Sequence, residues 1–245
     1  MFPRQTLSTL CCAALLIVQC GNDEDVIVDV FSPPPPDSPE AVIRSLETAY
    51  RTQNYDLLRT LLAHDPHRNA DYLFYLSEPT SLGEKQWDYE VESRIHRRMF
   101  RPQDLVAGET PVSTDLWLSS VAIHLTATRP FQERPDLYSA DHGADGKLDP
   151  EDWKASDAQY NTDVLFDTQS DVDYQVRGDA NFVVIEDLTK HVGEGGKFLL
   201  YIWEELQRLP KSEFSYAGSS WSRIKYLYRC VQLHPRWEAL SLTSS

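Results

Sequence analysis

The chain has 245 residues, of which 41% are hydrophobic, and this is enough apolar material for one domain with its own core. Its formal net charge is −15. Since binding to phosphate backbones depends on clustered lysine and arginine, this charge argues against nucleic acid and anionic headgroups as partners. Only four cysteines are present, and three of them lie within the first twenty residues, which argues against a structural disulfide.

Residues 1–19 have the pattern of a removable export signal. Arg4 is their only charged residue, and an apolar stretch runs from Leu10 to Val18. A membrane-spanning helix needs about 20 apolar residues, so this stretch is too short to span a bilayer. Its removal takes the net charge from −15 to −16, because Arg4 is lost.

The sequence Ile17-Val18-Gln19-Cys20 resembles the lipobox of bacterial lipoproteins. The resemblance implies a lipid such as palmitate on Cys20, cleavage that makes Cys20 the new N-terminus, and a place in the bacterial cell envelope, at the outer membrane. The lipid bilayer would then be a partner of the chain. Gln19 departs from the pattern, since the family usually has a small residue there. The alternative is an ordinary secretory signal followed by an incidental cysteine.

Residues 20–38 are predicted to form a tether between the membrane and the domain. They combine the acidic run at 22–25 with four consecutive prolines at 33–36, which favour an extended, semi-rigid conformation. We expect the folded domain to cover residues 39–230 and a C-terminal tail to cover residues 231–245.

The first half of the domain has helical patterns. Ser38 and Pro39 are typical of a helix start, and apolar residues then recur at helical spacing to residue 50. A second short helix is expected over 55–63, and a strand over 71–77. A third helix is expected over 84–100, with Glu90, Glu92, Arg94, Arg97 and Arg98 turned largely outward.

The second half has the residue types and spacing of strands. We expect them at 116–127, 162–168, 173–176 running on to 182–188, 197–205 and 221–228. The predicted fold class is therefore α+β, with three N-terminal helices packed on a strongly curved antiparallel sheet. A long insertion at 129–160 separates two of these strands and has no assigned role.

This order of elements resembles the nuclear transport factor 2-like superfamily, a cystatin-like cone. The resemblance rests on the helix that begins Ser38-Pro39-Glu40-Ala41-Val42, the Asn54-Tyr55-Asp56 corner, the helix end Arg98-Met99-Phe100 and the segment 198–206. The segment 220–229 is similar to the tail of a group of uncharacterised bacterial lipoproteins. These resemblances imply a hollow between helices and sheet. They imply no particular activity, because this fold carries isomerases, hydrolases, scaffolds and binding domains.

Candidate catalytic residues lie on the predicted strands. His124 is on the polar side of strand 116–127, and it could act as a general base if that side faces the hollow. Asp163 and Asp167 share one side of their strand and could form a carboxylate pair. Exposed positions on a solvated sheet face explain all three residues equally well.

Residues 141–152 partly match the loop that binds calcium in EF-hands. Oxygen ligands would come from Asp141, Asp145, Asp149 and Asp152, with Gly146 at the sharp turn. Gly143 removes the third ligand, and no amphipathic helix precedes the loop. The sequence therefore leaves open both a weak Ca²⁺ site and an acidic surface loop closed by an Asp-Gly turn.

We expect no cofactor, because the sequence contains no phosphate-binding glycine loop and no Gly-x-Ser-x-Gly elbow. The leading interpretation is an envelope lipoprotein whose domain binds a small apolar ligand or a protein partner without catalysis. One alternative is an enzyme of the isomerase or cyclase type, with a pocket histidine or aspartate as base. Another is a scaffold or assembly domain that acts through the outer sheet face, for example by forming a homodimer.

Overall fold

The computed structural model describes residues 35–65, 68, 70–77, 79–80, 83–138, 148–170, 173–191, 196–206 and 220–229. The predicted signal peptide, Cys20, most of the tether and the tail lie outside these residues. Within the described part of the chain, no helix combines the length and the apolar character needed to cross a membrane.

The described residues form four α-helices, eight strands and two short 3-10 helices. The α-helices are α1 (Pro39–Arg51), α2 (Tyr55–Leu61), α3 (Tyr89–Phe100) and α4 (Trp221–Tyr228). The strands are β1 (His64–Asp65), β2 (Ala70–Asp71), β3 (Leu73–Tyr75), β4 (Gln86–Asp88), β5 (Leu118–Glu133), β6 (Trp153–Thr168), β7 (Tyr174–Asp187) and β8 (Phe198–Leu206). The 3-10 helices are η2 (Thr114–Leu116) and η3 (Pro135–Leu137).

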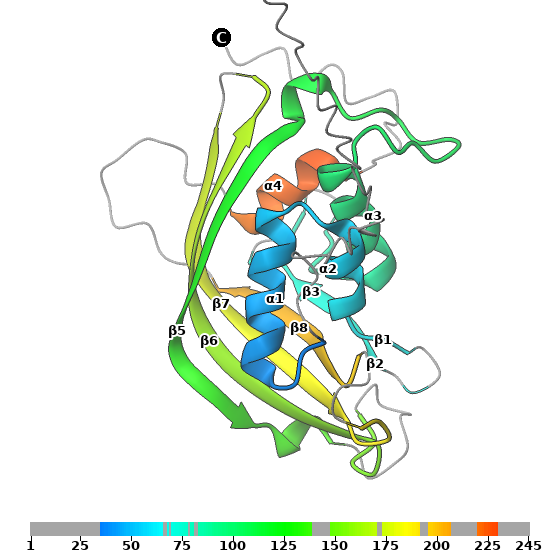
Figure 1. The fold of residues 1–245 in the computed structure, drawn as a ribbon, viewed down its shortest axis with the longest axis vertical. Coiled ribbons are helices and arrows are strands. Elements are labelled where there is room, and N and C mark those ends of the chain that lie inside the picture. Colours follow the sequence, from blue (N-terminus) through cyan, green and yellow to red (C-terminus); the bar gives the residue numbers. More distant parts are fainter. Residues whose placement is uncertain are drawn as a thin grey trace, which may run out of the picture. The chain divides into compact units, whose positions relative to one another are not determined.

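Six strands form one curved sheet in the order β4-β3-β8-β7-β6-β5, and the helices pack against its concave side (Figure 1). This confirms the predicted α+β class and the helix layer on a strongly curved sheet. The sheet is mixed and not antiparallel throughout, because β3 pairs with β8 in parallel. The other neighbouring pairs of this sheet are antiparallel.

Local sequence explains where the first helices begin. The Ser38 side chain accepts a hydrogen bond from the amide of Ala41, and Pro39 follows at the first helical position. Asn54 caps α2 in the same way, through the amide of Leu57. The apolar face of α1 is buried at Val42, Ile43, Leu46, Ala49 and Tyr50, as its spacing predicted.

Two predicted elements need correction. The third helix begins at Tyr89 and not at Glu84, because Gln86–Asp88 pairs with β3 and the Asp88 side chain caps the helix. The segment 221–228 is a helix and not a strand. Its buried residues Trp221, Ile224, Lys225 and Tyr228 lie three and four positions apart, so they share one helical face, and Ser220 caps the first turn.

Both ends of the predicted insertion at 129–160 extend the sheet. Strands β5 and β6 stay paired as far as Gln132 with Asp157 and Glu133 with Ser156, so the two strands are each 16 residues long. Residues 139–147 lie outside the described part. The described ends of the insertion therefore lengthen the β5–β6 pair.

Aromatic side chains fill the space between the helices and the concave sheet face. Tyr50 from α1 packs edge-on to Trp203 and Trp221, and Phe74 and Phe182 contact Trp203 from neighbouring strands. All five side chains are at most 1% exposed. The hollow expected from the sequence is thus occupied by the chain's own side chains at this level.

Candidate functional site

The predicted catalytic residues lie on the exposed side of the sheet. His124 is exposed on β5, and it faces Asp163 of β6 in the strand register. The Asp163 carboxylate accepts hydrogen bonds from Gln175 (3.1 Å) and Arg177 (3.2 Å), and Asp167 accepts one from Ser120. The condition under which His124 could serve as a base in the hollow is therefore not met.

The predicted calcium loop is described only at its end. Asp141 and Asp145 lie outside the described residues, so the ligand set is not seen as a whole. The Asp149 side chain accepts a hydrogen bond from the amide of Glu151 at 2.9 Å, as expected for a closed turn. Asp152 follows in the same turn, and no group of three metal-ligating side chains occurs within the described ranges. Calcium binding stays a prediction.

The concave interior contains a cluster of ionisable side chains that the sequence analysis did not find. Glu92 and His96 lie one turn apart on α3, Tyr50 comes from α1 and Lys225 from α4, and each is at most 1% exposed. The prediction that Glu92 and Arg98 point outward is wrong, since Glu92 is fully buried and Arg98 is 5% exposed. The spacing of Glu92, His96 and Met99 on one helical face was the available signal.

Hydrogen bonds fix the tautomer of His96. Its Nδ1 lies 2.9 Å from the backbone carbonyl oxygen of Glu92, and a carbonyl can only accept, so Nδ1 carries the proton. Burial holds the pKa of His96 well below its ordinary value, so the imidazole is neutral and Nε2 accepts the hydroxyl proton of Tyr50. The imidazole is thus satisfied at both nitrogens.

Lys225 reaches from α4 into the same cluster. Its ammonium nitrogen pairs with Glu92 Oε1 and lies 3.5 Å from the ring centre of Phe74 and 4.2 Å from that of Trp203. A carboxylate and aromatic faces are the surroundings that stabilise a buried ammonium group. Lys225 thus occupies the centre of the interior.

Burial determines the protonation of these groups. Burial raises the pKa of the Glu92 carboxyl and lowers the pKa of the Lys225 ammonium, while the attraction between them opposes both shifts. Burial, and then the charge of Lys225, hold the pKa of His96 well below its ordinary value of 6.5. Burial also raises the pKa of Tyr50 and of Tyr72, so both phenols stay protonated.

Two oxygens in or beside this cluster have no hydrogen-bond partner among the described residues. They are Glu92 Oε2 and the hydroxyl of Tyr72, which is fully buried. Leaving a buried polar atom unpaired costs about 1–3 kcal/mol, more when it is charged. The second carboxylate oxygen of Glu92 is therefore a buried acceptor without a donor, and no described surface pocket is lined by Glu92.

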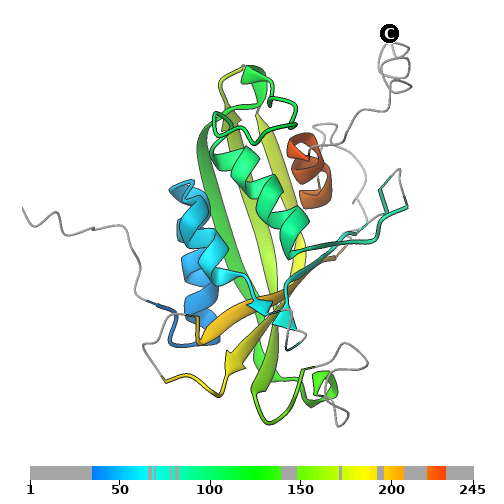
Figure 2. The same ribbon diagram turned by 90° about the vertical axis from the view of Figure 1, so that its right-hand side faces the viewer.

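Polar contacts hold α4 over the interior. At its N-terminal end, the Glu205 carboxylate accepts hydrogen bonds from the amides of Trp221 (2.7 Å) and Ser222 (3.2 Å). At its C-terminal end, Arg98 donates to the carbonyl of Tyr228 at 2.6 Å, and Arg229 pairs with Glu84. Figure 2 shows α4 beside α3 on the concave side of the sheet. Helix α4 closes the interior at this position.

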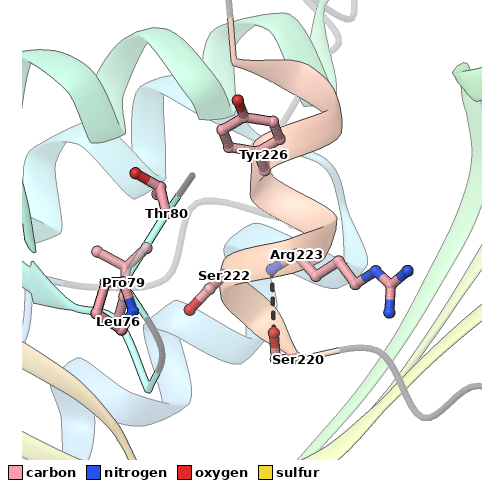
Figure 3. Close-up of a pocket in the computed structure, with 7 residues that line it drawn as sticks. All are labelled: Leu76, Pro79, Thr80, Ser220, Ser222, Arg223 and Tyr226. Carbon is pink, nitrogen blue, oxygen red and sulfur yellow. Dashed lines mark hydrogen bonds between the residues drawn. The ribbon is translucent and has the colours of Figure 1, made fainter. Parts of the chain in front are cut away.

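A surface pocket of about 260 Å³ lies between α4 and the residues that follow β3 (Figure 3). Leu76, Pro79 and Thr80 form one side, and α4 contributes Ser222 and Tyr226 to the other. Arg223 also borders it, but its side chain points away from the other side chains drawn (Figure 3). Arg223 is the one charged residue among the described residues that line this pocket, and no buried acid or base lines it.

A larger surface pocket, of about 490 Å³, lies beside α2. Its apolar part comes from α2 and β8, through Leu57 and Leu199 among others, and Pro35 and Pro36 form part of its wall. Arg59, His64 and Lys190 are its basic residues. This combination of an apolar floor and basic groups is the most ligand-like surface among the pockets described here.

No protein-family model and no curated protein matches the chain. Among solved structures, it is similar to a nuclear transport factor 2-like superfamily protein from Salmonella enterica, with 8% identity over 71% of this chain and 91% of that one and a TM-score of 0.39.

It is also similar to a presumed aromatic ring hydroxylase from Novosphingobium aromaticivorans, with 11% identity, coverage of 70% and 87%, and a TM-score of 0.40. A third similar structure is a presumed calcium/calmodulin-dependent protein kinase type II association domain from Thiobacillus denitrificans, with 15% identity, coverage of 72% and 100%, and a TM-score of 0.38. The activities in these names are said of those proteins alone.

The neutral state of buried His96 predicts a loss of stability in mild acid. An unfolded histidine binds a proton near pH 6.5, whereas folded His96 does so only well below that value. Its contribution is therefore complete above about pH 6.5 and is lost as the pH falls toward the folded pKa. Below pH 6.5 this group should lower the free energy of unfolding by up to about 1.4 kcal/mol per pH unit.

Urea unfolding of the wild type, His96→Gln and His124→Gln between pH 8 and pH 5.5 measures this effect. The difference between wild type and His96→Gln should shrink with falling pH, because glutamine does not titrate. His124→Gln replaces an exposed histidine and is the matched control for the substitution itself. Parallel curves for His96→Gln would show that buried His96 does not titrate in this way.

Proposed function

We propose that this chain is a lipid-anchored binding protein of the bacterial cell envelope, whose domain binds a small ligand at its surface without catalysis. One observation carries the non-catalytic part of the proposal. The groups suited to acid-base chemistry, Glu92 and His96, are at most 1% exposed, and Lys225 of α4 pairs with the Glu92 carboxylate. A general base must come within hydrogen-bond distance of the proton that it removes.

The anchor part of the proposal rests on the sequence at Cys20. The lipobox-like residues 17–20 precede a proline-containing segment, and the described domain begins directly after it, with α1 at Pro39. A lipidated N-terminus would place the domain near a membrane surface at a distance limited by this segment. The outer-membrane location is part of the same proposal.

One observation favours an enzyme as the second candidate. Glu92 Oε2 has no partner in the described part of the chain, and burial raises the pKa of this carboxyl. These are the properties of a general base in the isomerases that share this fold class. Such a role requires the interior to open to substrate. The base would then be Glu92, since His124 and Asp163 lie on the exposed face.

Pairing through the outer sheet face gains little support from the exposed residues. Leu165, at 37% exposure, is the one large hydrophobic side chain of β5, β6 and β7 that counts as exposed among the described residues. Its neighbours on that face include His124, Asp163 and Arg177. A stable dimer interface usually has a larger apolar centre.

Chemical modification of histidine separates the binding protein from the enzyme. Diethyl pyrocarbonate attacks neutral imidazole, and His96 is neutral at pH 7, so its reaction rate reports access and not protonation. Peptide mapping by mass spectrometry should find His96 modified at least about tenfold more slowly than exposed His124, because only opening of the interior exposes it. Equal rates at the two histidines would mean an open interior and would favour the enzyme.

Mass spectrometry of the membrane fraction tests the anchor. The mature chain should begin at Cys20 and carry acyl chains, and Cys20→Ala should move the protein from the membrane to the soluble fraction. Cys12→Ala is the matched control and should leave the protein in the membrane. An unmodified mature chain that begins at another residue would contradict the anchor while leaving the binding role untouched.

A further inference from the structure

The surface pocket beside α2 contains a guanidinium group with unused hydrogen-bonding capacity. Arg59 Nε donates to the hydroxyl of Tyr89 at 3.0 Å. The two terminal nitrogens of Arg59 have no hydrogen-bond or ion-pair partner within the ranges that the structure describes. Glu90 acts on Arg59 only as a weak, more distant charge. Arg59 therefore presents two terminal nitrogens, with four N–H groups, that have no partner among the described residues.

Contacts of the neighbouring ring hold Arg59 in place. Tyr89 is 5% exposed, and its ring stacks on that of His64 with centroids 4.0 Å apart and planes 9° from parallel. His64 in turn is hydrogen-bonded to Asp71 at 2.8 Å. This chain of contacts joins α2 to α3 and to the β1-β2 hairpin. Arg59 is thus fixed at Nε while its terminal nitrogens stay available.

The other basic groups of this pocket already have carboxylate partners. Lys190 lies 3.6 Å from Asp187, and His64 pairs with Asp71. Arg59 has no carboxylate within ion-pair distance among the described residues, although the chain has a net charge of −15. The uncompensated positive charge of the pocket is therefore that of Arg59, which suits an anionic ligand.

We propose that the pocket beside α2 binds an amphipathic oxyanion, a carboxylate or phosphate group on an alkyl chain. The oxyanion would take both terminal nitrogens of Arg59, a geometry that guanidinium and planar or tetrahedral oxyanions share. The alkyl chain would lie on the leucines of α2 and β8. The volume of about 490 Å³ is within the range of small-molecule sites. This inference rests on the proposed function and names its ligand class.

The position of the pocket relates this ligand class to the anchor. Pro35 and Pro36 line it, and Pro35 is 15 residues beyond Cys20, so at about 3.3–3.6 Å per extended residue the pocket lies within about 50 Å of a lipidated Cys20. A molecule released from a membrane, such as a fatty acid or an alkyl phosphate, would be available there. The pocket in Figure 3 is not lined by residues of the predicted tether, and the side chain of Arg223 points away from it.

Isothermal titration of the full mature chain with octanoate, octyl phosphate and octanol tests the proposal. The two anions should bind saturably, and octanol should bind at least about tenfold more weakly, because it has the alkyl chain without the charge. Arg59→Gln should weaken the binding of both anions by at least about tenfold. Arg223→Gln is the control, since Arg223 borders the other pocket and is equally exposed to solvent.

Each outcome bears on a different claim. Binding of octanoate alone or octyl phosphate alone, lost in Arg59→Gln, supports the site and identifies its headgroup. Equal binding of octanol and the anions, or unchanged binding in Arg59→Gln, overturns it, and loss in Arg223→Gln would move the site to α4. None of these binding results bears on whether the interior is accessible. The non-catalytic role therefore fails only if His96 reacts as fast as His124.

Discussion

The contact between Lys225 and Glu92 is the interaction on which the rest of the structure depends. Both side chains are completely buried, and neither could stay charged in an apolar interior without the other. The contact joins α4 to α3 and brings the ammonium group against Phe74 and Trp203 of the sheet. It therefore links the last described helix to every layer of the domain.

A buried ion pair is a weak source of net stability, because desolvation offsets most of the attraction between its charges. Its stronger effect here is on position. A helix of eight residues is too short to be stable alone, so α4 depends on its tertiary contacts. Since Glu205 holds one end and Arg98 the other, the pairing of Lys225 with Glu92 sets which face of α4 turns inward. That face fills the hollow between the helices and the sheet. The proposal of a non-catalytic role depends on this, because it leaves Glu92 and His96 buried.

The sequence predicted the layered fold because most of its elements have clear periodic patterns. The first two helices lie where helical spacing places them, and β7 and β8 lie close to the predicted strands, whereas β5 and β6 run past their predicted bounds into 129–160. Segment 221–228 was misassigned because its aromatic and branched residues favour a strand, while its i, i+3, i+4 and i+7 burial becomes decisive only once α3 is present to cover it. The parallel pairing of β3 with β8 is likewise a tertiary feature with no local signal.

The candidate site was harder to predict because its residues are charged and the usual expectation places charges outside. Glu92 and Lys225 are 133 positions apart, and only the folded chain brings them together. The sequence did not indicate Arg59 either. Its role rests on the absence of a carboxylate partner among the described residues, which only the folded chain shows. The acidic composition did argue against anionic partners in general, and the pocket beside α2 is a local departure from that average.

A double-mutant cycle on Glu92→Met and Lys225→Met, followed by urea unfolding, tests the central claim most directly. Each single variant leaves one charged group buried without its partner and should lose about 3–5 kcal/mol of stability, whereas the double variant keeps the volume without the charges. We predict that the double variant is more stable than either single one, which means a strong coupling between the two sites. Additive losses would contradict the account, since they would mean that Lys225 and Glu92 do not depend on each other.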